Sequence, residues 1–343
     1  MARSDPALNL SGIEARPPRQ RAQLLKQWAT PLRIALSTGL LWFLFVRVGG
    51  ELSLMIPRLT PGGVAWLTGA AGLLILSYVL STVRWHQVIE ALGLRDGFRR
   101  LLSHFLAGQF MSNALPTTIG GDVVRVARLS RDTGDSPSSF ASVVLDRLTG
   151  WIVLPLITVV GFGLNPALRE TAQSRVTLMI AGTTFGLLLL VLFAADVDRL
   201  GGRFAGRPGW QRFIDAVHLG VGRLRRRPRA TISVIAAGIV YQFVLVTAAF
   251  MMARALGIDI GLTAMMAFFP AVLIAQVLPI SVSGLGVREF MLVWLLRSVG
   301  VFQAQAIALG LVVWIMTVVT SLMGAPSYAF GARTSRPIRE ELV

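Results

Sequence analysis

Apolar residues along this chain gather in long runs, and short basic stretches separate one run from the next. A helix needs about 20 predominantly apolar residues to cross the hydrocarbon core of a bilayer, whereas a surface helix of a soluble protein keeps a polar face along its length. The pattern therefore predicts an all-α integral membrane protein with about six full transmembrane helices. We place them at Leu32–Val48, Gly63–Val83, Ser138–Gly163, Val176–Ala195, Thr231–Ala255 and Gln303–Phe330.

Two further apolar stretches, Leu101–Leu115 and Leu262–Leu278, are shorter. Each runs into a break that contains proline and glycine, and a helix is expected to resume after it, at about Val123–Ser130 and at about Val287–Val299. Non-helical backbone at membrane depth is tolerated only where protein or a water-filled cavity covers it. We therefore expect two re-entrant helical hairpins, each entering and leaving the membrane on one side.

Basic residues indicate which side of the membrane each helix end faces. The tail through Arg33 and the segments Arg84–Arg100 and Asp196–Arg229 carry an excess of basic residues, which is typical of cytoplasmic loops. With these segments and the C-terminal residues inside, the first hairpin enters from the cytoplasm and the second from outside. Both termini are then cytoplasmic.

The two ends of the chain differ in composition from its middle. Residues 1–31 are polar, basic and interrupted by proline, which predicts a disordered cytoplasmic tail. The first apolar run lacks the small-residue cleavage site of a signal peptide, so we expect it to remain as a helix. Residues 32–331 then form a single transmembrane domain, and residues 332–343 form a second cytoplasmic tail. Lysine is scarce beside arginine, alanine and glycine; this suggests a GC-rich genome, and we expect a bacterial cytoplasmic membrane.

A formal net charge of +16 could indicate a nucleic-acid partner. The basic residues flank apolar runs, however, where membrane topology requires them, so no nucleic-acid partner is expected. The absence of cysteine excludes disulfides, thiolate metal ligands and cysteine nucleophiles. His86, His104 and His218 show no ligand spacing, so we expect neither a metal nor a cofactor.

The two breaks resemble each other. Leu115–Arg125 and Leu278–Arg288 share a Leu-Pro pair, a glycine, a valine and the final arginine at a constant offset of 163 positions. The same offset aligns the flanking apolar runs, which argues against a chance likeness of two turns. The repeat halves are then about 62–163 and 225–326, and an odd number of predicted crossings separates them. This predicts an inverted-topology repeat, as in many transporters whose interrupted helices mark the substrate site.

The break residues have distinct expected roles. Proline stops a helix, glycine permits tight turning, and hydroxyl side chains can satisfy freed backbone groups or line a substrate path. We expect the structural breaks at Pro116, Gly120, Gly121, Pro279, Gly284 and Gly286, and substrate contacts from Thr117, Thr118, Ser281 and Ser283.

Charged residues inside the apolar part are the strongest indication of a site. Each costs on the order of 2.5–3.5 kcal/mol at the centre of a membrane helix, so it is normally paired or faces a polar cavity. One interpretation is that the charges pair only to lock the hairpins, Asp146 with Arg125 or Arg147 and Glu289 with Arg288. The other is a polar cavity for a charged headgroup, in which arginines and helix N-termini bind a phosphate. The candidate substrate-binding charges are Arg125, Arg288, Asp122, Asp146, Arg147 and Glu289.

Arg84, Trp85 and His86 stand at the end of a predicted span. This position predicts an interfacial anchor.

Three motifs together resemble those of one family. They are Asn113-Ala-Leu-Pro with Gly-Gly-Asp-Val-Val-Arg125, then Ser142-Val-Val-Leu-Asp-Arg147, then Leu278-Pro-Ile-Ser-Val-Ser-Gly-Leu-Gly-Val-Arg-Glu289. Over roughly residues 30–330 the chain resembles the flippase-like family known as the lysylphosphatidylglycerol synthase transmembrane region. Bifunctional members continue into an aminoacyl-transferase domain, whereas this sequence ends at Val343, so we expect a stand-alone flippase-like protein.

The resemblance implies a membrane lipid translocase. It would move an anionic or aminoacylated phospholipid, a hopanoid or a related lipid between leaflets, and its partners would be membrane lipids. No P-loop motif occurs, so direct use of ATP is not expected. Two alternatives stay open: an integral-membrane lipid-modifying transferase, or a membrane subunit that partners a separately encoded lipid-biosynthetic enzyme.

Overall fold

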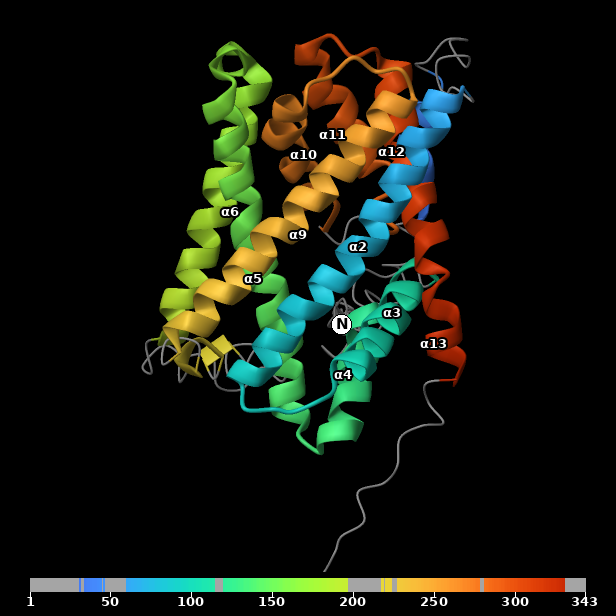
Figure 1. Ribbon diagram of the computed structural model, residues 1–343. Helices are drawn as coiled ribbons and strands as arrows, with labels where there is room; N and C mark the ends of the chain where they lie inside the picture. Colours follow the sequence, from blue (N-terminus) through green and yellow to red (C-terminus); the bar gives the residue numbers. More distant parts are fainter. Residues whose placement is uncertain are drawn as a thin grey trace, which may run out of the picture.

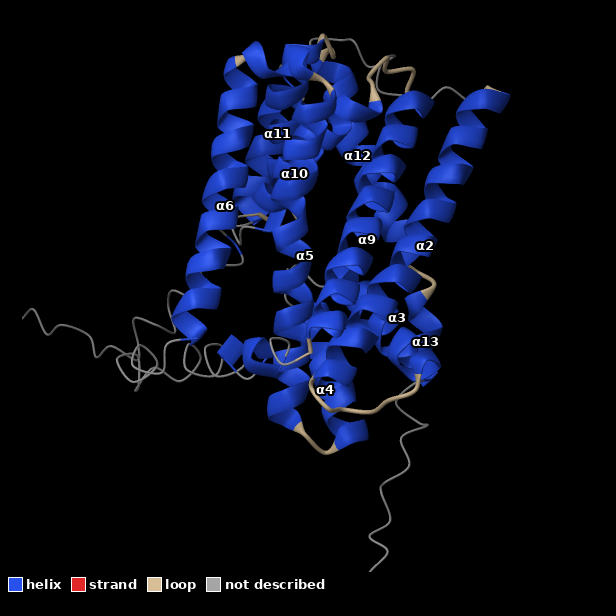
Figure 2. Cartoon of the chain, turned by 60° about the vertical axis from the view of Figure 1, so that its left-hand side comes forward, coloured by secondary structure: helices blue, strands red, loops and turns tan. Residues whose placement is uncertain are grey.

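The structure is a computed structural model. It describes residues 31, 34–44, 46, 60–114, 120–196, 217–218, 220–223, 227–277 and 281–330. Over these residues the secondary structure is helical, without strands (Figure 2). The predicted all-α membrane fold is confirmed. The expected tails at residues 1–31 and 332–343 fall almost wholly outside the described residues.

Five helical segments are long and apolar enough to cross a membrane. The predicted spans after the first are therefore confirmed. The first predicted span is described in part, as a shorter apolar helix over Ile34–Leu44. The five segments are α2 (Pro61–Ala91), α5 (Ser136–Leu164), α6 (Ala172–Asp196), α9 (Pro228–Ala255), and α12 (Gln303–Ser321) continued by α13 (Gly324–Phe330).

Local capping explains where two of these helices begin. The hydroxyl of Thr60 accepts a hydrogen bond from the Gly63 N–H at 3.2 Å, and Pro61 occupies the first turn of α2, where a missing N–H costs nothing. At the start of α5, the carboxylate of Asp135 accepts a hydrogen bond from the Ser138 N–H at 2.9 Å. Hydrogen bonds from Ser138 lower the pKa of Asp135.

Two pairs of shorter helices lie between the long ones. The first hairpin is α3 (Phe98–Ala114) with α4 (Gly120–Thr133), and the second is α10 (Leu262–Val277) with α11 (Val287–Leu296). In Figure 1 the first hairpin occupies the lower part of the bundle and the second the upper part. Short 3₁₀ turns lie at Pro166–Glu170 and Arg297–Val299. A re-entrant path through a bilayer stays a prediction.

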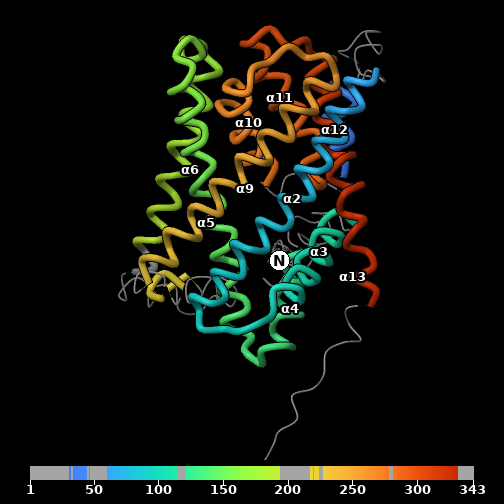
Figure 3. Tube along the Cα trace, viewed as in Figure 1, coloured from blue at the N-terminus to red at the C-terminus, as the bar shows by residue number. Residues whose placement is uncertain are grey.

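Several features of the helix arrangement support the predicted repeat. The first arms of the two hairpins, α3 and α10, end at residues 114 and 277, which are 163 positions apart. The second arms, α4 and α11, end at residues 133 and 296, which are also 163 positions apart. The helices α2 and α9, which precede the two hairpins, pack side by side and run in opposite directions (Figures 1 and 3). These observations fit an inverted repeat, which itself stays a prediction.

The apolar side chains divide between core and surface as in a membrane bundle. The largest core joins α9, α10, α11 and α12 and includes Met265, Phe268 and Leu292. A smaller core packs the first hairpin against α2 and α5 and includes Trp85 and Leu101. By contrast, α6 exposes large apolar side chains along its length, which suits contact with lipid and not with water: Met179, Leu187, Leu189, Leu190 and Phe193.

Candidate functional site

Asp146 is the centre of a buried charge cluster. One carboxylate oxygen accepts a hydrogen bond from Arg84 Nε at 2.8 Å, and the other accepts one from Arg125 Nη2 at 2.8 Å. All three residues are at most 5% exposed. The cluster joins α2, α4 and α5 through side chains that have left water, where charge-assisted hydrogen bonds are strong and an unpaired charge is costly.

Arg84 belongs to this cluster, so its prediction as an interfacial anchor was wrong. The helix α2 continues for eight residues beyond the predicted end at Val83, and Arg84 is therefore inside the helix and not at its end. Its guanidinium lies 5.0 Å from the ring centroid of Tyr241. Trp85, which follows Arg84, is fully buried as well.

Aromatic rings enclose Arg125. Its guanidinium lies 4.1 Å from the ring centroid of Trp85 and 5.1 Å from that of Phe105. The indole N–H of Trp85 donates to the Ser142 hydroxyl at 3.1 Å, which fixes the ring. A carboxylate and two aromatic rings therefore enclose the Arg125 guanidinium, and its predicted contact with substrate stays a prediction.

Arg147 points to a different partner. Its Nε and Nη2 donate to the two oxygens of Asp122 at 3.0 and 3.1 Å, which is a bidentate pair. The pairing of Asp146 considered from the sequence was therefore right for Arg125 and wrong for Arg147. Asp122 also lies 3.7 Å from Arg125, so it links both pairs. The Arg147 side chain is 39% exposed, far more than the buried arginines.

The second hairpin carries one local charge pair. Arg288 donates to the Glu289 Oε1 from Nε at 3.1 Å and from Nη2 at 2.8 Å. The other oxygen of Glu289 accepts the Gly286 N–H at 2.6 Å. An internal carboxylate therefore already occupies part of the α11 N-terminus that was predicted to receive a lipid phosphate. Gly310 on α12 makes room for Glu289, because a Cβ there would lie 2.8 Å from its Cγ.

The predicted break residues differ in their backbone roles. Gly284 and Gly286 have φ values of 78° and 84°, which favour glycine. Gly120 and Gly121 open α4 directly after residues 115–119, which lie outside the described residues, so their predicted role in the break stays a prediction. A Cβ on Gly121 would overlap the Gly108 carbonyl oxygen, and the residue is needed for close packing of α3 against α4.

Two of the predicted hydroxyl residues, Ser281 and Ser283, lie in the described turn of the second hairpin. Ser281 is buried, and Ser283 adopts a positive φ of 49° in the turn before α11. The remaining candidates lie outside the described residues: Pro116, Thr117, Thr118 and Pro279.

A cavity of about 280 Å³ lies between the helices of the two proposed halves. Arg147 from α5 and Arg288 from α11 both line it, together with Ser283, whereas Arg84, Arg125 and Asp146 do not. The other polar lining residues come mainly from α2, α3, α9 and α10, and apolar side chains complete the wall. The polar group comprises Ser77, Tyr78, Gln109, Ser112, Asn113, Tyr241, Gln276 and Thr317.

A family model described as the lysylphosphatidylglycerol synthase TM region matches residues 31–324. The chain belongs to this family. The match spans both hairpins, the charge cluster and the cavity, so the resemblance carried by the three motifs is confirmed. Among curated proteins, no sequence matches the chain. Family and fold together identify a multi-pass membrane protein related to lipid handling.

Proposed function

We propose that the protein is a flippase-like translocase that moves lipids with an anionic headgroup between the leaflets of a bacterial cytoplasmic membrane. One observation carries the proposal: Arg147 and Arg288, one from each proposed half, line the same cavity. Guanidinium groups bind phosphate through two parallel hydrogen bonds. An arginine from each half places such donors on two sides of one headgroup.

The cavity suits a headgroup better than a whole lipid. Its volume of about 280 Å³ lies just below the range of ligand pockets, roughly 300–1,000 Å³. Apolar side chains such as Leu245, Phe269 and Leu273 form part of the wall. We infer that a lipid would place its headgroup between the arginines and keep its acyl chains against apolar helix surfaces.

The two cavity arginines can exchange a carboxylate partner for an anionic headgroup. Arg147 pairs with Asp122 and Arg288 pairs with Glu289, so each cation has a carboxylate partner within the protein. An anionic headgroup competes with these carboxylates for the same N–H donors. Such exchangeable binding suits a carrier, because a substrate that is to leave must not be held too strongly. In an inverted repeat, one half would rock against the other around this site.

Reconstituted protein tests the proposal directly. Liposomes are prepared with the purified protein and a trace of headgroup-labelled phosphatidylglycerol, and a membrane-impermeant quencher reports how fast label passes from the inner to the outer leaflet. We expect exchange faster than in protein-free liposomes, without any soluble substrate or nucleotide.

The same liposomes discriminate the alternatives. A lipid-modifying transferase, or the membrane subunit of one, would show a new lipid product or no activity of its own, with no exchange above the protein-free rate. Either result, obtained with correctly folded protein, would contradict the translocase.

A further inference from the structure

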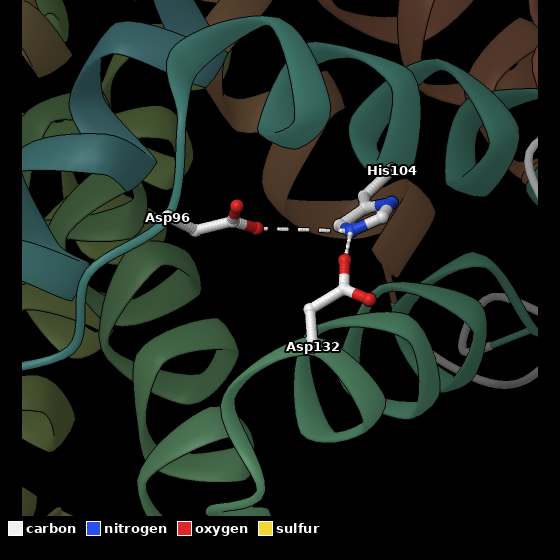
Figure 4. A group of neighbouring side chains, drawn as sticks. All are labelled: Asp96, His104 and Asp132. Atoms are coloured by element: carbon white, nitrogen blue, oxygen red, sulfur yellow. Dashed lines mark hydrogen bonds and ion pairs between the residues drawn. The ribbon is translucent and has the colours of Figure 1, made fainter. Parts of the chain in front are cut away.

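A second polar cluster lies away from the cavity, where the connection after α2 meets the first hairpin. Asp96 precedes α3, His104 lies in its second turn, and Asp132 lies near the end of α4. Figure 4 shows both carboxylates directed at the same nitrogen of His104. His104 Nε2 lies 2.8 Å from Asp132 Oδ2 and 3.8 Å from Asp96 Oδ2.

The cluster is withdrawn from solvent and incompletely satisfied. The exposed fractions of the three side chains are 1% for Asp96, 6% for His104 and 6% for Asp132. Within the described part of the chain, the buried Oδ2 of Asp96 has no hydrogen-bond partner. A buried acceptor without a partner costs about 1–3 kcal/mol, and more when it is charged. A hydrogen bond between His104 and Asp132 alone leaves this oxygen unexplained.

We propose that Asp96, His104 and Asp132 bind a divalent transition-metal ion of the Zn²⁺ type. One atom from each side chain lies within 4.8 Å of the others. Two ligands of a tetrahedral zinc ion, at about 2.0–2.1 Å from the metal, lie about 3.3–3.4 Å apart. The observed spacings of 2.8 and 3.8 Å lie about half an ångström on either side of this value, so small side-chain rotations would admit the ion.

The donor set and the charge favour this class of cation. An imidazole nitrogen suits zinc and its neighbours, whereas Mg²⁺ and Ca²⁺ prefer oxygen ligands throughout. Two carboxylates face one imidazole. Arg100 lies 3.4 Å from Asp96, but its own side chain is 61% exposed. A divalent ion would compensate the excess negative charge and would join α3 and α4 to the connection that follows α2.

Metal binding can be measured on the full chain in detergent. The affinity tag is removed, the protein is treated with a chelator and dialysed, and Zn²⁺ is titrated with calorimetric and elemental readouts. We expect one zinc ion per chain. His104→Ala and Asp96→Asn should each weaken binding by more than about 100-fold, because loss of a residue that only hydrogen-bonds a metal ligand already costs about 10–100-fold. The matched control is His86→Ala, which removes a partly exposed histidine outside the cluster.

The structure of the bound site provides a readout that needs no variant. X-ray absorption on zinc-loaded wild-type protein should show a single imidazole with oxygen ligands. Two or more imidazoles would place the ion elsewhere and overturn the proposal. So would a wild-type protein that binds no zinc, or variants that bind it as tightly as wild type; the cluster would then be a buried hydrogen-bonded histidine only.

Discussion

The first hairpin is attached to other helices by buried charge as well as by apolar packing, whereas the second is attached mainly by apolar packing. In α4, Arg125 and Asp122 reach α5 through Asp146 and Arg147, and Arg125 shares Asp146 with Arg84 of α2. In α11, the described charge pair is between neighbours, Arg288 and Glu289, while α10 lies almost wholly in the largest apolar core. The two hairpins therefore depend on different interactions for their position.

The predicted repeat offset suggests a physical reason for the difference. Adding 163 to Asp146 and Arg147 leads to Leu309 and Gly310 on α12. Leu309 is fully buried and offers no carboxylate to Arg288, which pairs with Glu289 instead. Gly310 has no side chain, and Glu289 occupies the space. Buried charge thus joins the first hairpin to α2 and α5, whereas the second hairpin keeps Arg288 on the cavity wall with Glu289 as its local partner.

The largest expected effect on stability comes from the charge cluster that joins the first hairpin to α2 and α5. Asp146→Asn keeps the shape of the side chain but leaves Arg84 and Arg125 without their shared carboxylate. Removing one member of a buried ion pair costs roughly 3–5 kcal/mol. We expect a clearly lower unfolding midpoint in detergent, measured by tryptophan fluorescence and size exclusion. Asp259→Asn is the control, because Asp259 pairs with Arg254 at 2.6 Å but is 97% exposed; equal midpoints for both variants would contradict this role of the charge cluster.

A smaller effect is expected from the packing of α3 against α4. Gly121→Ala places a methyl group against the Gly108 carbonyl oxygen and the Ser112 hydroxyl. Overpacking typically costs 1–3 kcal/mol, so about that loss of stability should appear in chemical unfolding. Gly72→Ala, a helical position with open space around its Cβ, should leave stability unchanged. If the two variants are equally stable, the close approach of the helices is not required.

The smallest effect is expected from the local pair of the second hairpin. Glu289→Gln removes the charge that faces Arg288 but retains an amide oxygen for the Gly286 N–H. Because Glu289 pairs with one arginine, whereas Asp146 pairs with two, we expect a smaller loss, about 1–2 kcal/mol. The comparison with Asp146→Asn in the same unfolding assay is decisive. A larger loss of stability for Glu289→Gln would contradict the conclusion that buried charge contributes more to the position of the first hairpin than to that of the second.

The apolar runs predicted the long helices well, because run length alone decides whether a helix can cross a bilayer. Their ends were less predictable. The helix α2 extends past Val83 because Arg84 finds a buried carboxylate, and no local pattern announces a partner 62 positions away. Closely spaced glycines correctly predicted the turn at Gly284 and Gly286, where φ is positive. Gly121 is also a glycine, but there the missing side chain permits close helix packing.

The site was predicted by residue type but not by role. Asp146 and Arg147 are adjacent, and consecutive side chains on an α-helix differ by about 100° in direction. One therefore faces α2 and α4, while the other faces the cavity. The sequence alone does not fix the rotation of α5, so it could not distinguish Arg125, which is enclosed, from Arg147, which is open. Asp96, His104 and Asp132 are likewise separated in the sequence, and only the fold brings them together.

The most direct test of the central claim is the headgroup dependence of lipid exchange. Labelled phosphatidylglycerol and labelled phosphatidylcholine are compared in liposomes that contain wild-type protein, Arg147→Gln, Arg288→Gln or the control Arg254→Gln, whose site lies outside the cavity lining. Loss of a charged hydrogen bond costs about 1.5–3 kcal/mol, so each cavity variant should slow exchange of the anionic lipid at least about tenfold, with the control at the wild-type rate. Wild-type exchange of the anionic lipid in both cavity variants would contradict a shared headgroup site between the two hairpins.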